Sequence, residues 1–536
     1  MKTKPLQRIR NTSAGLLLAA CLVAPALASD SSWNVDAAGN FTDSGNWSAG
    51  VPGAAGTGAT STDIATFPKS ILTASRLVNF DANYNLGGIT FDNSTNNAFS
   101  YQIGGATFGG ATTGTLTLSP NAQILITGSL GSTSVNNGLD ANMVLGGNAS
   151  ITNNYLNTVY NFGNSAGTSA NTVTTAASLG NIDLTLGGTS TASSLMAMRL
   201  NQASGTTLRL VKEGTGTWQL NGLSTGAQGM AGGLLLRQGQ VVIGRSSAAS
   251  IGTGAFVVGD GSTVAGDLRV NLGSSVNVSN AITVAGSAAT NVYFERGGGS
   301  GGGTVSGNIS MSRDVIFRQG SANAQTLAVT GAITGTGNVT VNTSLAATGA
   351  VNFTTGGLNM TGSFSNISSN GTSLVTVSGA IGSNVTGVIQ NSATSNMTLS
   401  NAGNLYGATT VTAGTLLVTG SGKLGTGDIS VAGGAGLSLA NNATINDSAS
   451  LLFANLANIS LAFTGTDTIG ALGNTSTLTY IGLGTYTATE LNTFFGGSVF
   501  SGTGSLQITA VPEPKVWILL ALSLAAVLIL RRRRTT

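Results

Sequence analysis

The chain has 536 residues, of which 41% are hydrophobic and only 7% are charged, and 79 are glycine. Disordered chains combine low hydrophobicity with high net charge, so this composition argues against a largely disordered protein. Soluble amphipathic helices need a charged face, which 21 basic and 18 acidic residues cannot supply along such a length, so we expect few helices.

Residues 1–28 are typical of a secretory signal peptide. Basic residues precede an apolar stretch from Ala14 to Leu27, and Ala26 and Ala28 occupy the small-x-small positions of a signal peptidase site. We predict that residues 1–28 direct export and are then removed. An alternative stays open, because the sequence around Cys21 resembles a lipobox, in which Cys21 would be lipidated.

Residues 29–70 differ from the body of the chain in carrying two tryptophans. Trp33 and Trp47 bracket turns rich in Asp, Asn and Gly. The end of a solenoid must cover an exposed apolar face, and we interpret this stretch as that cap. Stacking of Trp33 or Trp47 on a sugar is the alternative interpretation.

The body of the chain consists of short alternating runs of Thr, Ser, Asn, Val and Gly, such as Thr115–Ser119 and Asn338–Asn342. Alternation with period two is typical of half-buried strands. No proline lies between Pro120 and Pro512, which suits continuous strand pairing because proline removes a donor from the ladder. We predict an all-β body over residues 29–510, with helix confined to the two ends of the chain.

A Gly-Thr-Gly-x-apolar-x-apolar pattern recurs in the body. Its glycines allow a tight turn and its alternating residues form a strand, so each copy predicts a corner followed by a rung. The copies are Gly214–Leu220, Gly252–Val258, Gly335–Val341, Gly425–Val431 and Gly502–Ile508.

Longer similarity lies in Asn401–Val418 and, more loosely, in Leu210–Gly222. These stretches resemble the autotransporter-associated β-strand repeat. The resemblance implies a right-handed parallel β-helix or β-solenoid, whose stacked coils bury Val, Leu and Ile and leave Thr, Ser and Asn outside.

A Gly-rich stretch at residues 296–307 divides the predicted solenoid into a first part, residues 71–295, and a second part, residues 308–510. The stretch lacks the Gly-Lys-Ser/Thr ending of a phosphate-binding loop. We therefore interpret it as a flexible loop or hinge.

Residues 29–514 contain no Cys and no His, which excludes thiolate and imidazole metal sites, Cys nucleophiles and His-based triads. We predict no cofactor and no metal. The same residues hold 12 basic and 18 acidic side chains, a net charge of −6, so we expect no nucleic-acid partner.

Some parallel β-helices are polysaccharide lyases or hydrolases, which need grouped carboxylates or bases. The nearest approach in this sequence is Asp260 with Asp267, together with Arg269. Aspartates in turns more often bond their own backbone, and the dense Asp/Gly nonapeptide of calcium-binding solenoids is missing from this sequence. We predict that the protein is not an enzyme, and a β-helical carbohydrate-active enzyme is the alternative.

Residues 511–536 combine Pro512-Glu513-Pro514, an uncharged stretch at positions 516–530, and four arginines at positions 531–534. As a helix the stretch would span about 22 Å, which is short against the roughly 30 Å of bilayer hydrocarbon. The positive-inside rule places the arginines in the cytoplasm. The prolines disfavour helix before the stretch and leave an extended segment that a processing enzyme can grip.

This order of motif, membrane segment and basic tail closely resembles the PEP-CTERM sorting signal. The matching residues are Pro512, Glu513 and Pro514 for the motif, Val516 to Leu530 for the membrane segment, and Arg531, Arg532, Arg533 and Arg534 for the tail. The resemblance implies recognition by an exosortase in a Gram-negative-type bacterium. It also implies a transient inner-membrane anchor, followed by delivery to the cell surface or the exopolysaccharide matrix. A plain tail anchor is the alternative.

We therefore predict an exported structural or adhesin-like surface protein. Its expected partners are signal peptidase, exosortase and, transiently, the inner membrane, with exopolysaccharide or other glycans as candidate ligands.

The absence of Cys and His from residues 29–514 leads to a test of stability. A solenoid held by stacked apolar rungs, without Cys or His, needs neither disulfides nor transition metals. Thermal melts of the mature protein with and without dithiothreitol and EDTA should therefore superimpose. A large fall in melting temperature on adding EDTA would point to calcium held by carboxylates.

Overall fold

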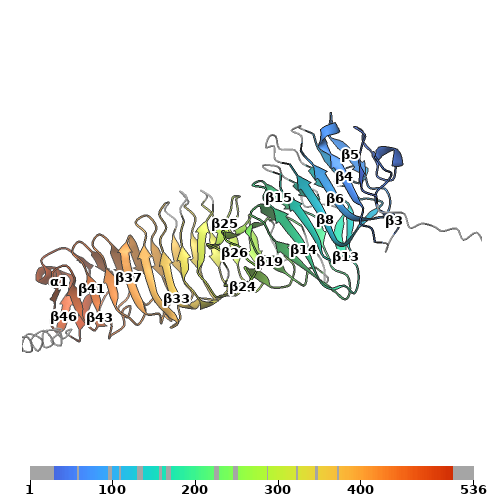
Figure 1. Cartoon of the computed structure of the whole chain (residues 1–536). Coiled ribbons are helices and arrows are strands. Elements are labelled where there is room, and N and C mark those ends of the chain that lie inside the picture. Colours follow the sequence, from blue (N-terminus) through green and yellow to red (C-terminus); the bar gives the residue numbers. More distant parts are fainter. Residues whose placement is uncertain are drawn as a thin grey trace, which may run out of the picture.

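The computed structural model describes residues 29–56, 60–94, 99–107, 110–128, 137–155, 160–163, 171–222, 229–244, 251–286, 288–320, 324–343, 348–370 and 374–510. These residues form an elongated parallel β-solenoid of about 15 turns with almost no helix (Figure 1). The all-β solenoid predicted from the sequence is confirmed. The predicted signal peptide and sorting signal lie outside the described residues. Among the residues described, no helix is long and apolar enough to cross a membrane.

Each coil contributes strands to flat faces, and each strand pairs in parallel with the strand one coil further on. The first face runs through β1 (Ser31–Ser32), β4 (Ile64–Pro68), β6 (Tyr84–Asp92), β8 (Thr115–Thr127), β11 (Ala149–Asn153), β14 (Gly180–Gly188), β17 (Thr206–Lys212), β19 (Leu234–Leu236), β21 (Phe256–Val258), β24 (Ile282–Val284), β27 (Ile309–Met311), β30 (Ile333–Thr336) and β33 (Leu358–Asn366).

The second face runs nearly the whole length of the molecule. Its strands are β2 (Gly39–Asn40), β5 (Arg76–Asn79), β7 (Tyr101–Gly104), β9 (Asn137–Leu139), β12 (Tyr160–Phe162), β15 (Ser193–Met196), β18 (Thr217–Leu220), β20 (Gly239–Ile243), β22 (Leu268–Leu272), β25 (Val292–Arg296), β28 (Val315–Gln319), β31 (Val339–Val341), the second half of β33, β35 (Val385–Asn391), β37 (Ala408–Ala413), β39 (Ile429–Val431), β41 (Leu451–Phe453) and β44 (Leu472–Asn474).

The third face is built in two separate stretches. The first stretch pairs the beginning of β8 with β10 (Asn142–Leu145), β13 (Thr172–Thr175) and β16 (Arg199–Leu200). The second stretch contains β23 (Val276–Val278), β26 (Gly303–Val305), β29 (Leu327–Val329), β32 (Val351–Phe353), β34 (Val375–Val377), β36 (Met397–Leu399), β38 (Thr415–Val418), β40 (Gly436–Leu439), β42 (Asn458–Leu461) and β47 (Phe500–Gly502).

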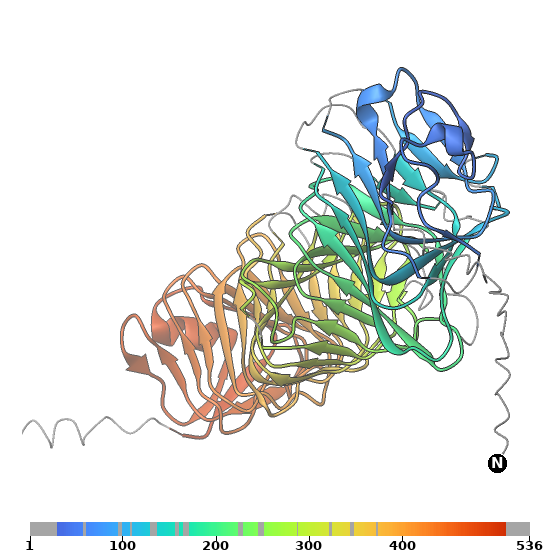
Figure 2. The same cartoon turned by 45° about the vertical axis from the view of Figure 1, so that its right-hand side comes forward.

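Between these stretches, the described residues show only an isolated bridge, Asn201↔Gly229. Figures 1 and 2 show the solenoid changing direction in the same region. The bend therefore lies where the third face is interrupted, while the first and second faces continue through it.

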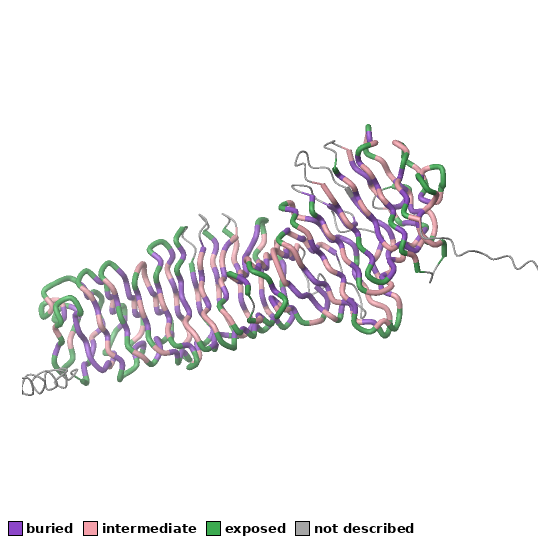
Figure 3. The backbone as a smooth tube through the Cα atoms, viewed as in Figure 1, coloured by how far each residue is buried: buried purple, intermediate pink, exposed green. Residues whose placement is uncertain are grey.

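The core consists of columns of side chains that stack from coil to coil. Val305, Val329, Phe353 and Val377 lie directly above one another on the third face, each in the coil after the one before. All four are buried, and the middle residue of each of these three-residue strands faces outward. Figure 3 shows this alternation of buried and partly exposed residues along the solenoid. Because the strands pair in register, the period-two pattern of the sequence becomes continuous apolar columns.

Each of the five Gly-Thr-Gly units leads into a strand, as predicted, either directly or after one further residue, and the units at 335 and 502 begin within the last residues of β30 and β47. The strands are β18, β21, β31, β39 and β48 (Ser505–Ile508). Gly214 illustrates the corner, because its φ is +69° and a Cβ there would lie 2.3 Å from the carbonyl oxygen of Gly188 in the preceding coil. Only glycine fits such a close approach without strain.

The N-terminal end is closed by aromatic side chains. The rings of Trp33 and Trp47 meet edge to face at 5.3 Å, and Phe41 and Phe67 pack against Trp47. The indole Nε1 of Trp47 donates a hydrogen bond to the carbonyl oxygen of Phe41 at 2.8 Å. Short flanking elements complete this end: η1 (Ser44–Asn46), β3 (Ala54–Ala55), which pairs antiparallel with β6, and η2 (Lys69–Ile71).

The C-terminal end is closed by antiparallel strands and one helix. β43 (Thr466–Ile469) pairs with β48, β48 pairs antiparallel with β46 (Gly484–Thr487), and β45 (Thr479–Tyr480) pairs antiparallel with β44. The helix α1 (Ala488–Phe495) begins with a reciprocal capping box between Thr487 and Glu490 and ends at Gly496 in the left-handed conformation. The prediction that helix is confined to the ends of the chain is therefore wrong for α1, which lies inside residues 29–510.

The Gly-rich stretch at 296–307 wraps around its own first residue. Arg296 is fully buried at the end of β25, and its guanidinium donates hydrogen bonds to five backbone carbonyl oxygens. The acceptors are Leu272, Gly297, Gly298, Gly299 and Gly301. The turn leads directly into β26, and strand pairing continues on both sides of it.

Replacement of Arg296 should destabilise this corner strongly. Arg296→Met removes the donors to five carbonyl groups, of which those of Leu272 and Gly297 belong to buried residues, and this should lower the free energy of unfolding by about 3 kcal/mol. The measurement is the urea-unfolding midpoint. Arg199→Met, at an exposed position on β16, is the matched control and should change the midpoint little. Equal effects of the two variants would mean that the hydrogen bonds from Arg296 to the five carbonyl groups contribute nothing specific to stability.

Candidate functional site

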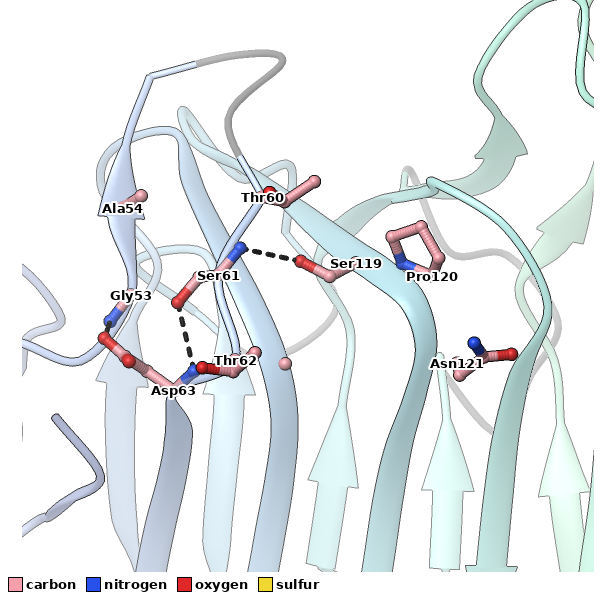
Figure 4. Close-up of a pocket in the computed structure, with 10 residues that line it drawn as sticks. Gly53, Ala54, Thr60, Ser61, Thr62, Asp63, Ser119, Pro120 and Asn121 are labelled. Carbon is pink, nitrogen blue, oxygen red and sulfur yellow. Dashed lines mark hydrogen bonds between the residues drawn. The ribbon is translucent and has the colours of Figure 1, made fainter. Parts of the chain in front are cut away.

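A hollow of about 600 Å³ lies beside the N-terminal coils. It forms where the segment before β4 approaches the bend of β8 at Pro120 (Figure 4). Its lining residues are Gly53, Ala54, Thr60, Ser61, Thr62, Asp63, Gly87, Ser119, Pro120 and Asn121.

The polar groups of this hollow are largely used within the fold. Asp63 Oδ2 accepts a hydrogen bond from the backbone N–H of Gly53 at 2.7 Å, and in Figure 4 the carboxylate points toward Gly53 rather than toward Pro120. Ser119 Oγ accepts from Ser61 N at 2.9 Å, and Ser61 Oγ accepts from Asp63 N at 3.0 Å. Asp63 is the one ionisable residue in the lining, so the hollow lacks the pair of acid and base groups that hydrolysis requires.

The carboxylates singled out in the sequence are held by different arginines. Asp260 pairs with Arg237 at 2.9 Å, and Arg237 also pairs with Glu213 at 2.7 Å. Asp267 pairs with Arg269 at 2.9 Å and accepts a hydrogen bond from Asn291 at 3.0 Å. The structure therefore builds these aspartates into separate ion pairs. Asp260 pairs with an arginine of the preceding coil, whereas Asp267 pairs with an arginine two residues further along its own coil.

Both aspartates are held in the ionised form. Burial raises the pKa of Asp260, but hydrogen bonds from Arg237 and Ser262 outweigh it and lower the pKa below the usual value. Burial also raises the pKa of Asp267, and hydrogen bonds from Asn291 and Arg269 again lower it overall. A carboxylate with a lowered pKa is a poor proton donor near neutral pH, so neither residue fits the general acid of a glycosidase.

Further charged side chains form a ladder on the outside of the second face. Arg318 pairs with Glu295 at 2.6 Å and lies over the ring of Tyr293, 4.1 Å from its centroid. Arg269 lies over the same ring at 5.1 Å. These contacts join the three successive coils of β22, β25 and β28, and they resemble the cross-strand pairs that stabilise sheets.

Lys212 was missed by the sequence reasoning. It is buried at the end of β17, and its Nζ donates to the carbonyl oxygens of Glu213, Gly214 and Gln238 at 2.6 to 2.9 Å. Burial lowers its pKa to about 7, a value that would suit a catalytic lysine. However, all three ammonium protons are donated to backbone carbonyl groups of the corner, and these contacts indicate a structural role for Lys212.

Trp33 and Trp47, considered as sugar-stacking residues, are also committed to the core. Their exposed fractions are 0% and 4%, so neither ring offers a face to a ligand. The signal peptidase residues Ala26 and Ala28, the motif Pro512-Glu513-Pro514 and the arginine tail lie outside the described residues.

Asp467 is a buried carboxylate near the C-terminal end that the sequence did not reveal. Its Oδ2 accepts hydrogen bonds from the backbone N–H groups of Thr444 at 3.2 Å and Ile445 at 3.1 Å. Burial raises its pKa to about 6, and the nearby Asp447 adds to the rise. The backbone donors hold the side chain in a corner of the coil, as Lys212 is held by carbonyl groups.

Comparison with family models, curated proteins and solved structures found no match to this chain. Within the described part of the chain, no three His, Cys, Asp or Glu side chains lie close enough together to hold a metal ion. The distinctive features of the described structure are therefore its ion pairs, its buried charged side chains that bond to the backbone, and its closed ends.

The raised pKa of Asp467 predicts how stability depends on pH. Because its folded pKa of about 6 exceeds its ordinary value of 3.8, the folded state binds the proton more tightly, and this group's contribution to stability falls as pH rises through about 6. Asp467→Asn keeps an acceptor for the two N–H groups and removes the buried charge. After allowance for solvent screening, it should raise the free energy of unfolding by about 1–2 kcal/mol at pH 8.

The gain should shrink toward zero at pH 4, as measured by urea unfolding at both pH values. Asp428→Asn, at an exposed position, is the control and should show little effect at either pH. A loss of stability at pH 8 in the Asp467 variant would contradict the interpretation.

Proposed function

We propose that this chain is an exported structural or adhesin-like protein of the bacterial cell surface or exopolysaccharide matrix, released from the inner membrane by an exosortase. The single observation that carries the proposal is the order of Pro512-Glu513-Pro514, an uncharged stretch at positions 516–530 and four arginines. Four arginines resist transfer across a membrane, because each costs about 2.5–3.5 kcal/mol at its centre. They retain the chain until it is cut near the motif.

The solenoid body supports a structural role. About 15 stacked coils make an elongated rod whose outer faces carry mainly Thr, Ser and Asn, and whose ends are closed by caps. By the general rule for parallel crossover connections, we take the coils to be right-handed. Such a body presents a long polar surface to a hydrated matrix, so we propose glycans of that matrix as its surroundings.

The same observations favour a role without catalysis. The aspartates nearest to a catalytic pair lie in separate arginine ion pairs, with pKa values below the usual range. The hollow near the N-terminal end is lined by hydroxyl groups and one aspartate. Neither arrangement supplies the acid and base that polysaccharide cleavage needs.

Cleavage at the motif can be tested in the native host. Mass spectrometry of the extracellular protein should find a C-terminus at or near Pro514 and no peptide from Val516 onward. Replacement of Pro512, Glu513 and Pro514 by alanine should leave full-length protein in the inner-membrane fraction. Lys423→Ala, an exposed position in the body, is the control and should be released normally.

Two results would contradict the proposal. Either surface protein that still carries Arg531–Arg534, or normal release of the triple-alanine variant, would show that the segment is a plain membrane anchor.

A further inference from the structure

The C-terminal end of the solenoid exposes an unusual set of apolar side chains. Of ten large hydrophobic residues exposed in the described part of the chain, five lie between positions 456 and 494, although these positions are a small part of the sequence. The five are Leu456, Leu478, Tyr480, Leu483 and Phe494, with exposed fractions from 41% to 83%. We call them the end patch. Single exposed apolar residues are ordinary, but a concentration at one end needs a reason.

Two members of the end patch, Leu456 and Leu478, lie on adjacent turns. Asn474 Nδ2 donates to Asn455 Oδ1 at 2.8 Å, and Asn455 N donates to Ser476 Oγ at 3.0 Å, so the turns that carry Leu456 and Leu478 lie side by side. A groove of about 670 Å³ runs between these turns and the end of α1. Its lining includes Leu456, Thr477 and Phe495, the neighbour of Phe494.

Two of these leucines are held in a backbone conformation that leucine disfavours. Leu456 has φ +65° and is 83% exposed, and Leu478 has φ +55° and is 80% exposed. Asn or Gly would adopt the left-handed conformation at lower cost and would suit an exposed turn better. Strain and exposure together at two neighbouring leucines point to a role outside the folded chain itself.

The described chain ends beside this patch. Ala510 N donates to the carbonyl oxygen of Gly470 at 2.8 Å, and Tyr480 pairs with Gly473, which lies shortly after Gly470. Leu483 directly precedes Gly484, which pairs with Ile508. The end patch therefore extends from the last described residues across the final coils.

From these contacts we infer that the end patch rests in the interfacial region of the lipid bilayer while the chain is anchored. The inference depends on the proposed function, because it takes residues 516–530 as the membrane segment. Only residues 511–515 separate that segment from Ala510, and a segment of that length spans at most about 18 Å. The anchor thus holds the final coils against the membrane, where leucines enter the headgroup boundary and tyrosines lie at the interface.

The charges near the end patch identify the kind of contact. From Leu424 to Ala510 the ionisable residues with charge are Asp428, Asp447, Asp467 and Glu490, all acidic. Attraction between these residues and anionic headgroups therefore contributes nothing, and the contact of the end patch is apolar. It should persist at high salt.

The test uses the mature chain from residue 29 to residue 536, which contains no cysteine, so a single introduced cysteine can be labelled. An NBD fluorophore on Thr477→Cys, at an exposed position between the two leucines, reports the polarity of the end patch. In mixed phosphatidylethanolamine and phosphatidylglycerol vesicles, its emission should shift to the blue, and nitroxide lipids labelled near the headgroup should quench it. The same label on Ser369→Cys, exposed in the middle of the rod, should show neither change.

A paired variant separates docking from folding. Leu456→Asn with Leu478→Asn should abolish the blue shift, and because Asn tolerates positive φ, the variant should melt at least as high as the parent chain. Leu374→Asn, at a residue that is 51% exposed far from the end, is the matched control and should leave the shift intact.

Flotation of the vesicles separates failure of the anchor from failure of the membrane contact. Chain that fails to float with the vesicles would overturn the anchor of the proposed function. Chain that floats while the probe at position 477 stays in water would overturn the membrane contact alone. A blue shift that appears without vesicles and grows with protein concentration would also overturn it, since the patch would then join two copies of the chain.

Discussion

In-register stacking of parallel strands is the constraint on which the rest of this structure depends. A shift of one residue between coils would turn a whole column of core side chains outward. The chain meets this constraint although its coils differ in length: the coil from Met143 to its partner Val173 is longer than the coil from Leu327 to its partner Val351. The differences in length fall in the connections and at register shifts within three strand pairs, β6–β8, β33–β35 and β35–β37. The first two faces therefore continue through the bend and past the interrupted third face.

The corners impose a second requirement, because some of their turns direct backbone carbonyl groups toward a buried side chain. Lys212 donates to three such carbonyl groups and Arg296 to five, and both side chains end a strand just before a glycine-containing turn. Buried cations are normally compensated by acids, but here backbone dipoles compensate them. Asp467 is the counterpart with opposite charge, since backbone N–H groups hold it. In each case the buried charged side chain holds the backbone of a corner through hydrogen bonds.

Sequence alone predicted the parts of the fold that depend on local pattern. Alternation predicted the strands, and Gly-Thr-Gly predicted corners, because both signals lie within a few residues. Ion-pair partners could not be predicted, since Asp183 meets Arg209 and Glu295 meets Arg318 across coils of variable length. The helix α1 could have been found, because Thr487, Glu490 and Gly496 form start and stop signals that the low overall charge obscured. The hydrogen bonds from Arg296 to surrounding carbonyl groups could not be predicted from the sequence, since a Gly-rich run is equally typical of a hinge.

The two ends solve the same problem in different ways. A stack of coils leaves bare apolar columns and unpaired strand edges at each end, and caps of soluble solenoids are usually polar. The N-terminal end turns its aromatic rings inward, with Trp33 and Trp47 buried. At the other end β45, β46 and α1 close the last coils, yet Leu456 and Leu478 remain exposed in a conformation that leucine disfavours. This asymmetry gives the rod a direction: in the anchored state that we propose, the apolar end lies against the membrane, and the N-terminal cap and the polar faces extend away from it.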